Sequence, residues 1–523
     1  MSVALPRAAA AAAPPEAGRA ASVLTLLGLL LGAWLLWVPL SEVVLMNDML
    51  GYAAQGRSLL QGEGNVVVLG EARIPGYYPA GLPLIVAGAF AVLGDDLRHA
   101  QVVVWISLVL LLVLVALVAQ RAAGRWAAPV AVLTLLASGA LRQTATLTLS
   151  QVPTAALMLG SVLLFLAPGA RLPLFVAGLL ASASLVLRYA NASFPAALGL
   201  AGLLTCRARS ASPLRTLLVL GAGLFAGAGL VAAHNTWVYG APSATGYVLW
   251  GHEVEGQFSL RNIFAPVMIG NRGDESLMLH SFFGLGDMYQ PPVIAAAVWG
   301  GIVLIRAGGV RRMLGILSVT VVLAQDLFLA CYAFRSELYL VPALPLVVVL
   351  AAAGVVDAAS RLRAGWGGPL AVAAAALLLA VAVRGGVAPR DPSELEAIAR
   401  HDSLARAGRQ LPPDAALVTP SDFALVEPLV RTPGRRILYA GPFVSDVIEE
   451  AAMRELGGGK YWPNRVVPWI KERMKEGRPV YLDQNPPPRG LASSHKKLRA
   501  DIVVDYALQK TEIEGLFLLQ PKS

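Results

Sequence analysis

Residues 46–62, MNDMLGYAAQGRSLLQG, place an acidic and an aromatic side chain just after a hydrophobic segment that could span a bilayer. Asp48 and Tyr52 are four residues apart, so on a helix they share one face. Asp48, with Asn47, could simply cap that helix, because Asx side chains accept hydrogen bonds from a first turn. A carboxylate here could also take a proton from a hydroxyl or hold a divalent cation. Spacing alone leaves both interpretations open.

Arginines form the second chemically informative set. Arg142, Arg188 and Arg335 each stand at the end of a predicted membrane helix. Interfacial snorkelling would explain them, as would an ion pair such as Arg335 with Glu337. Guanidinium groups also bind phosphate oxygens bidentately, and fixed cations stabilise charge that builds on a leaving phosphate. These three residues are therefore candidates for holding a lipid phosphate.

A third set lies in the segment ATGYVLWGHEVEG. Tyr247 and Trp250 could stack on a sugar face or anchor the chain at the membrane interface. Glu253 could help to bind an acceptor. His252 is a weak candidate metal ligand, because no second histidine stands at ligand spacing. No metal site is predicted.

The elements that position these residues are mainly membrane helices. Hydrophobic residues make up 56% of the 523 residues, charged residues 14%, and the mean hydropathy is +0.63, which excludes an ordinary soluble protein. Apolar runs recur that are long enough to cross a hydrocarbon core of about 30 Å. Eleven spans are predicted, near residues 22–40, 100–119, 127–141, 151–167, 172–187, 189–205, 214–233, 290–306, 313–333, 337–356 and 367–384.

The charges between these spans predict the orientation. If the N-terminus is cytoplasmic, the inner turns are rich in arginine and contain one acidic residue, Asp357. The outer loops at 41–99 and 234–289 then hold most of the carboxylates of the membrane domain. The positive-inside rule therefore predicts a cytoplasmic N-terminus, and an odd number of spans places the C-terminal domain outside. The segment 77–94 is predicted to lie as a helix on the outer membrane surface, because another span would invert every later turn.

The remaining composition fits a multi-pass protein of the cell membrane. The net charge of +9 is explained by cytoplasmic loops and lipid headgroups, so membrane lipids are expected partners and nucleic acid is not. Cys206 and Cys331 fall in or beside different predicted helices and are read as small apolar core residues.

Three regions follow from these patterns. Residues 1–21 are predicted to be a disordered leader, residues 22–388 the membrane domain, and residues 389–523 an extracytoplasmic α/β domain. In this last region, helix-like stretches alternate with the strand-like AALVTP, RRILYA and RPVYLD. It has no nucleotide-binding loop, since GGGK lacks the required spacing. A scaffold or acceptor-recognition role is expected for it.

The order of several segments resembles a known family. The carboxylate after the first span, the tyrosine four residues later and YPAGLPL resemble the first outer loop of GT-C superfamily glycosyltransferases, which use polyprenyl-phosphate sugars. Within that superfamily, the similarity is to dolichyl-phosphate-mannose–protein mannosyltransferases and lipid A sugar transferases. Further segments fit the same order: RQTATLTLSQVPTAALMLGSVLLFL, LVLRYANASFPAALGL, NTWVYGAPSATGYVLW and FRSELYLVPALPLVVVLAAAG.

The resemblance covers most of residues 25–360 and implies an all-α, GT-C-like membrane domain of about 11 transmembrane helices with a small C-terminal α/β domain. It implies transfer of a sugar, with inversion, to a lipid, glycan or protein hydroxyl at the extracytoplasmic face. Asp48 would be the general base, and Arg142, Arg188 and Arg335 would hold the donor phosphate. The implied substrate-binding residues are Tyr52, Tyr78, Gln151, Tyr189, Tyr247, His252 and Glu253. No cofactor is required, although a phosphate and one carboxylate could hold Mg²⁺ or Mn²⁺.

One departure keeps two other functions open. Relatives often have a glutamate where this chain has Gln151, and glutamine cannot act as a base. A catalytically silent member of the family that serves as a binding subunit is therefore one alternative. The other is a transporter or flippase of lipid-linked sugars, although the sequence shows no inverted repeat or matched pair of broken helices.

Overall fold

The computed structural model describes fourteen segments of the chain. They are residues 15–43, 48–69, 72–167, 171–209, 212–246, 291–331, 337–362, 366–384, 406–419, 436–439, 463–483, 499–500, 502–513 and 515–522.

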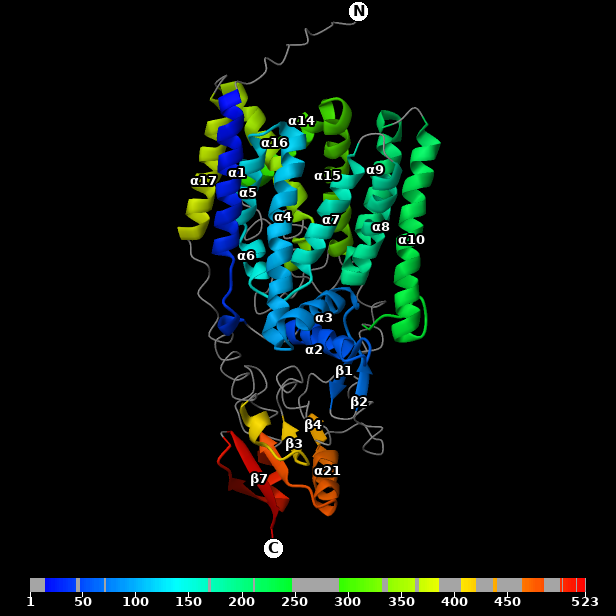
Figure 1. The fold of residues 1–523 in the computed structure, drawn as a ribbon, viewed down its shortest axis with the longest axis vertical. Coiled ribbons are helices and arrows are strands. Elements are labelled where there is room, and N and C mark those ends of the chain that lie inside the picture. Colours follow the sequence, from blue (N-terminus) through cyan, green and yellow to red (C-terminus); the bar gives the residue numbers. More distant parts are fainter. Residues whose placement is uncertain are drawn as a thin grey trace, which may run out of the picture.

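Long helices run side by side through the upper part of the molecule (Figure 1). Eleven described helices correspond to the predicted spans: α1 (Pro15–Leu35), α4 (Ala100–Ala123), α5 (Ala127–Ala137), α7 (Gln151–Phe165), α8 (Arg171–Leu187), α9 (Ser193–Arg209), α10 (Pro213–Tyr239), α14 (Pro291–Arg306), α15 (Gly309–Ala330), α16 (Leu344–Leu362) and α17 (Gly367–Arg384). Six described helices are long and apolar enough to cross a membrane. Four starts differ from the prediction by four residues or more: α1 begins at Pro15, α9 at Ser193, α15 at Gly309 and α16 at Leu344. Short 3-10 turns precede α9 and α16.

Helix α4 packs one face into the core of the bundle. Its residues Val104, Leu108, Leu111 and Val115 are fully buried and recur every three or four positions, so one continuous stripe packs into the core. Helices α1 and α10 lie toward opposite sides of the bundle in Figure 1, and both leave large apolar side chains exposed. Such side chains suit contact with lipid.

Glycines allow some helices to touch backbone to backbone. At Gly300 of α14, a Cβ atom would overlap the carbonyl oxygen of Leu350 in α16. At Gly354 of α16, a Cβ atom would overlap the carbonyl oxygen of Ala296. Small residues at helix crossings are typical of membrane bundles, where packing replaces hydrophobic burial as the driving force.

A second layer lies across the lower end of the bundle. Helices α2 (Asp48–Leu60) and α3 (Gly81–Leu93) lie across the helix ends in Figure 1. In the chain between these two helices, β1 (Val66–Leu69) pairs antiparallel with β2 (Ala72–Pro75). At 13 residues, α3 is about 20 Å long, too short for a hydrocarbon core of about 30 Å. This placement agrees with the surface helix predicted at 77–94.

The C-terminal region contains a five-stranded sheet in the order β4-β3-β5-β7-β6. Its elements are β3 (Ala416–Thr419), β4 (Arg436–Tyr439), α21 (Pro463–Lys475), β5 (Val480–Asp483), β6 (Tyr506–Lys510) and β7 (Leu516–Pro521). Strand β3 is parallel to β4 and β5, whereas β7 runs antiparallel to β5 and β6. Trp469 and Ile470 of α21 belong to the same apolar core as Val418 and Leu482 of the sheet. The predicted small α/β domain is confirmed.

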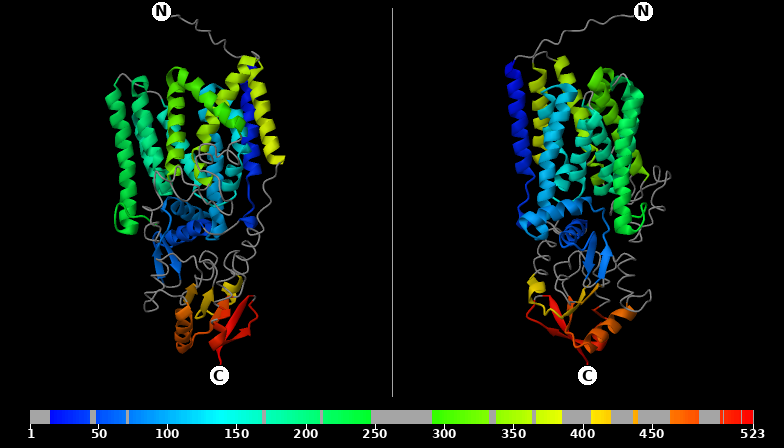
Figure 2. Two further views of the ribbon diagram at one scale, coloured as in Figure 1. Left: turned by 180° about the vertical axis from the view of Figure 1, so that it is seen from behind. Right: turned by 45° about the vertical axis from the view of Figure 1, so that its right-hand side comes forward.

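The two ends of the bundle differ in what they carry. In both views of Figure 2, the C-terminal sheet lies beyond the end that carries α2 and α3, and α1 begins at the other end. Helix α17 begins at that other end and runs back toward the sheet (Figure 1). Which end faces the cytoplasm remains the prediction made from the charges.

Candidate functional site

The site is organised around the hydroxyl group of Ser150, which immediately precedes α7. The Tyr52 hydroxyl on α2 donates a hydrogen bond to Ser150 Oγ at 3.1 Å. Arg188 Nη1, at the end of α8, donates to the same oxygen at 3.5 Å. Because Ser150 Oγ accepts both bonds, its own proton is left to donate to another group. Three segments far apart in sequence therefore meet at one hydroxyl.

Arg188 is a buried cation that lacks a described counter-ion. It is 8% exposed, and its guanidinium carbon lies 4.3 Å from the ring centroid of Tyr339 in the 3-10 turn Glu337–Leu340. In the described part of the chain, no carboxylate forms an ion pair with it. Burying an unpaired charge is costly. The arrangement therefore favours an anion at this point.

Asp48 is the first residue of α2 and is exposed. Its carboxylate is close enough to Tyr52 to affect that phenol. Burial raises the pKa of Tyr52 most strongly, and the Asp48 carboxylate raises it further, whereas Arg188 acts in the opposite direction. Tyr52 therefore keeps its proton and remains a hydrogen-bond donor. The Asp48 carboxylate and the Arg188 guanidinium group thus act on the pKa of this phenol with opposite sign.

Tyr78 packs against the ring of Tyr52. The two rings are stacked, with centroids 4.1 Å apart and planes inclined by 28°. Gly51 makes room for the stack, because a Cβ atom there would lie 2.6 Å from the Tyr78 ring. Two of the predicted substrate-binding residues thus form one aromatic unit.

The turn that carries Tyr78 is fixed by polar contacts. Gln55 Nε2 on α2 donates to Asn65 Oδ1 at 2.7 Å and to the carbonyl oxygen of Tyr78 at 2.9 Å. From α10, the Tyr239 hydroxyl donates to the carbonyl oxygen of Gly76 at 3.0 Å and, at 3.3 Å, to that of Tyr78. The turn is thereby attached to α2 through Gln55 and to α10 of the bundle through Tyr239.

Tyr189 follows Arg188 but reaches a different partner. Its hydroxyl donates to Asn235 Oδ1 on α10 at 2.8 Å. His234 Nδ1 lies 2.9 Å from the same oxygen, and its Nε2 accepts a hydrogen bond from the backbone N–H of Ala80 at 3.1 Å. This pair of contacts assigns the proton to Nδ1. Together they connect the end of α8, α10 and the start of α3.

Gln151 and Arg142 lie nearby in sequence but outside the Ser150 contacts. Gln151 is the first residue of α7 and is buried, and its Oε1 has no hydrogen-bond partner among the described residues. Arg142 lies on α6 (Gly139–Ala145) and is partly buried, and its Nη1 is likewise without a partner there. Their predicted roles stay predictions.

The other predicted site residues, Arg335, Tyr247, His252 and Glu253, lie outside the described residues. Ser150 and Tyr339 were missed by the sequence analysis, although both fall within segments that carried the family resemblance. Ser150 stands next to Gln151, and Tyr339 follows shortly after Arg335, so their closeness to candidate residues could have indicated them. In the described part of the chain, no group of three or more His, Cys, Asp and Glu side chains could hold a metal ion.

Solved structures share this fold, although no protein-family model and no curated protein matches the sequence. ArnT from Cupriavidus metallidurans bound to undecaprenyl phosphate aligns with a TM-score of 0.61 and 13% identity, over 97% of this chain and 98% of ArnT. Its apo structure gives 0.61 and 14%, over 96% and 98%. The archaeal oligosaccharyltransferase AglB from Archaeoglobus fulgidus gives 0.49 and 13%, over 96% of this chain and 74% of AglB. The ArnT likeness confirms the GT-C fold expected from the sequence.

Proposed function

We propose that this GT-C-fold membrane protein transfers a sugar from a polyprenyl-phosphate donor to a hydroxyl group of a lipid, glycan or protein at the extracytoplasmic face. The observation that carries the proposal is the buried Arg188, which has no described counter-ion and faces the Ser150 hydroxyl. A phosphate there would supply the missing negative charge. ArnT, which shares the fold, has been seen bound to undecaprenyl phosphate, and this supports a lipid phosphate as the ligand.

Asp48 is the proposed general base. The acceptor oxygen attacks the anomeric carbon of the sugar from the side opposite the phosphate, and its proton passes to the Asp48 carboxylate. The bond between the anomeric carbon and the phosphate oxygen breaks, and its electron pair stays on that oxygen. Configuration at the anomeric carbon is therefore inverted. The exposure of Asp48 leaves it accessible to an acceptor that arrives from outside the bundle.

Arg188 and Ser150 would stabilise the leaving group. The guanidinium group and the free Ser150 proton can both reach phosphate oxygens, and negative charge grows on those oxygens as the sugar departs. Tyr52 holds the Ser150 oxygen in place through its own hydrogen bond. Arg142 and Arg335 are proposed as further phosphate contacts, and Tyr78, Gln151, Tyr189, Tyr247, His252 and Glu253 as substrate contacts. We propose that the reaction needs no cofactor, because Arg188 supplies the charge that a metal would otherwise provide.

The test uses purified protein in vesicles that contain a radiolabelled polyprenyl-phosphate sugar and an acceptor-rich envelope lipid extract. Wild type is compared with Asp48→Asn and with Asp96→Asn, a matched control. Asp96 lies in the same outer segment, is exposed, and caps the backbone N–H of Arg98, which asparagine can also do. We expect Asp96→Asn to transfer sugar normally and Asp48→Asn to lose transfer.

Three outcomes would decide against parts of this proposal. Equal transfer by wild type and Asp48→Asn would exclude Asp48 as the base. Movement of intact donor between leaflets without transfer would favour a flippase. Binding of donor by wild type with neither transfer nor movement would favour a silent binding subunit.

A further inference from the structure

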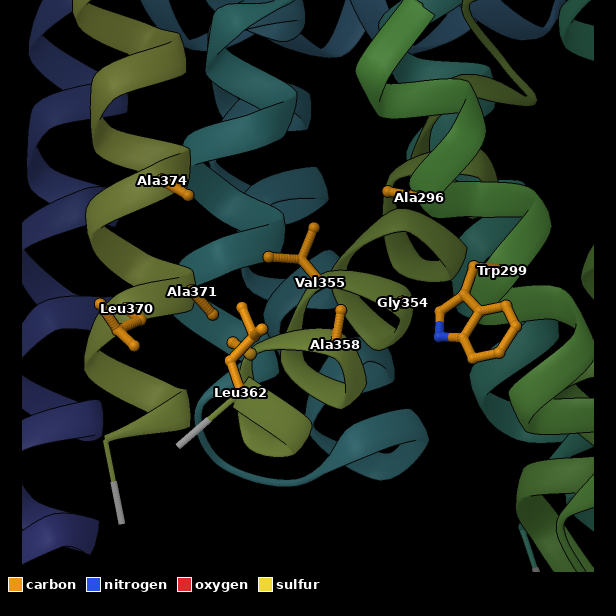
Figure 3. A pocket seen from close by; sticks show the side chains of 10 residues that line it. Ala296, Trp299, Gly354, Val355, Ala358, Leu362, Leu370, Ala371 and Ala374 are labelled. Carbon is orange, nitrogen blue, oxygen red and sulfur yellow. The ribbon is translucent and has the colours of Figure 1, made fainter. Parts of the chain in front are cut away.

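An open pocket lies between α14, α16 and α17, far from Ser150. Its volume is about 370 Å³, within the range of about 300–1,000 Å³ that is usual for small-ligand sites. Figure 3 shows Ala358 of α16 and Ala371 and Ala374 of α17 around the space. Because these side chains end at Cβ, they do not fill the gap between the helices. We refer to it as the α14–α16–α17 groove.

The groove opens toward the lipid-facing surface. Of its lining residues, Leu362 is 83% exposed, Leu370 is 44% exposed and Trp299 is 36% exposed. On the inner side, α14 and α16 touch at Gly300 and Gly354, which closes the space there. An almost wholly apolar recess that is open to lipid suits a hydrocarbon chain.

Polar side chains stand at the rim of the groove. Trp299 Nε1 donates to Asp357 Oδ2 at 2.9 Å, and Arg361 Nε donates to the same oxygen at 2.8 Å. The Arg361 guanidinium carbon lies 5.3 Å from the Trp299 ring centroid. Its side chain is 66% exposed, and its two Nη groups make no hydrogen bond to any described residue. Arg361 is therefore held in place with donors still available.

The same end of the bundle is positively charged. Arg306, Arg311 and Arg312 are exposed around the turn between α14 and α15. Asp357 is the single carboxylate at this end among the described residues of α14, α15, α16 and α17. Basic side chains next to an intramembrane recess attract anionic headgroups. Charge complementarity thus favours an anionic lipid over a zwitterionic one.

We propose that the α14–α16–α17 groove binds one acyl chain of an anionic phospholipid, with Arg361 donating hydrogen bonds to the lipid phosphate. The lipid belongs to the leaflet at the end where α1 begins. Along α16, about 26 Å separates Leu344, next to the Tyr339 turn, from Arg361. This site is therefore separate from Arg188 and does not depend on the proposed glycosyl transfer.

The test measures bound lipid by native mass spectrometry of the full-length protein. Phosphatidylglycerol and phosphatidylcholine with identical acyl chains are added in equal amounts. We expect wild type to retain phosphatidylglycerol preferentially, and Arg361→Gln to reduce that preference about fivefold. Arg361→Lys keeps the charge and should retain the preference. Arg215→Gln is the matched control, since Arg215 is exposed near the start of α10 and neither lines the groove nor lies in the turn between α14 and α15.

A second pair of variants tests the groove itself. Ala371→Leu and Ala374→Leu fill the space one helical turn apart on α17, and each should lower retention of both lipids. The melting temperature of each variant shows whether it is folded. Equal retention of the two lipids by wild type would overturn the proposal, as would an unchanged preference in Arg361→Gln. It would also be overturned if Ala371→Leu abolished binding of polyprenyl phosphate while phosphatidylglycerol retention stayed unchanged, because the groove would then hold the donor tail.

Discussion

Arg188 and Arg361 lie near opposite ends of the same bundle, and each is held against an aromatic ring. Arg188 is buried over Tyr339 and has no described carboxylate, whereas Arg361 is exposed over Trp299 and paired with Asp357. Water and Asp357 already balance the charge of Arg361. No described carboxylate balances the charge of Arg188, so an anion that reaches it gains the full electrostatic attraction of the guanidinium group. This difference distinguishes Arg188, which we propose binds the donor phosphate, from Arg361, which we propose binds a lipid headgroup.

The largest expected effect comes from removing the charge of Arg188. Arg188→Gln should lower the transfer rate by about 10²–10³-fold, because a fixed donor that stabilises the leaving phosphate is lost. The assay is initial-rate transfer of labelled sugar in vesicles. Arg98→Gln, which removes a partly buried cation at the same end of the bundle, should leave the rate unchanged. Normal transfer by Arg188→Gln would remove the contrast between the two arginines.

Asp48→Asn tests a different step from Arg188. Loss of the general base should lower the turnover rate by about 10²-fold and leave donor binding intact. Binding is measured with labelled polyprenyl phosphate, which Arg188→Gln should hold more weakly. Equal loss of binding in the two variants would mean that Asp48 acts on the donor and not on the acceptor.

Gly51→Ala tests whether the aromatic stack positions Ser150. The added Cβ atom would displace Tyr78 and, through it, Tyr52, so transfer should fall by about tenfold. Gly88→Ala on α3 is the control, because the added Cβ would meet no described atom within 4 Å apart from its chain neighbours and the backbone of its own helix. That variant should retain normal transfer and a melting temperature at least as high as that of wild type. Similar activity in both variants would show that the stack is only packing.

The smallest effect should follow removal of the Arg361 side-chain charge. Arg361→Gln should lower the free energy of unfolding by less than about 1 kcal/mol, because exposed ion pairs contribute little. Thermal unfolding in a detergent without anionic lipid measures the contribution of the Arg361–Asp357 ion pair alone. A larger loss would mean that the Asp357 pair supports the helix packing directly.

Hydropathy was enough to predict the helices of the bundle, and α3 lies across their ends within the segment 77–94 that was predicted to be a separate helix. The strands β3, β4 and β5 were also predicted, whereas β6 and β7 were missed. Strand β6 ends in the polar Gln509 and Lys510, and the apolar run 516–519 of β7 is only four residues long. The proximity of Asp48 and Tyr52 could be predicted because one helical turn relates them. Ser150 and Tyr339 could not, since their importance depends on how α7 and α16 are brought to the end of α8.

Two arginines with the same sequence feature, a position at the end of a predicted helix, have different surroundings in the structure. Arg142 and Arg188 both stand at predicted helix ends, and nothing in the sequence separates them. The structure places Arg188 on the Ser150 hydroxyl and Arg142 on a separate short helix without a described partner. Tertiary packing decides which of two equivalent positions reaches the centre of the site.

The contact between Tyr239 and Gly76 has a consequence for biogenesis. The two residues are 163 positions apart, and at about 5–20 residues per second a ribosome needs about 8–33 s to synthesise the chain between them. During that time the segment 48–93 has left the ribosome but lacks the α10 contacts that fix its turn. The turn can therefore be fixed only after seven helices of the bundle have been made, and a chaperone or the insertion machinery has that interval in which to act on the segment.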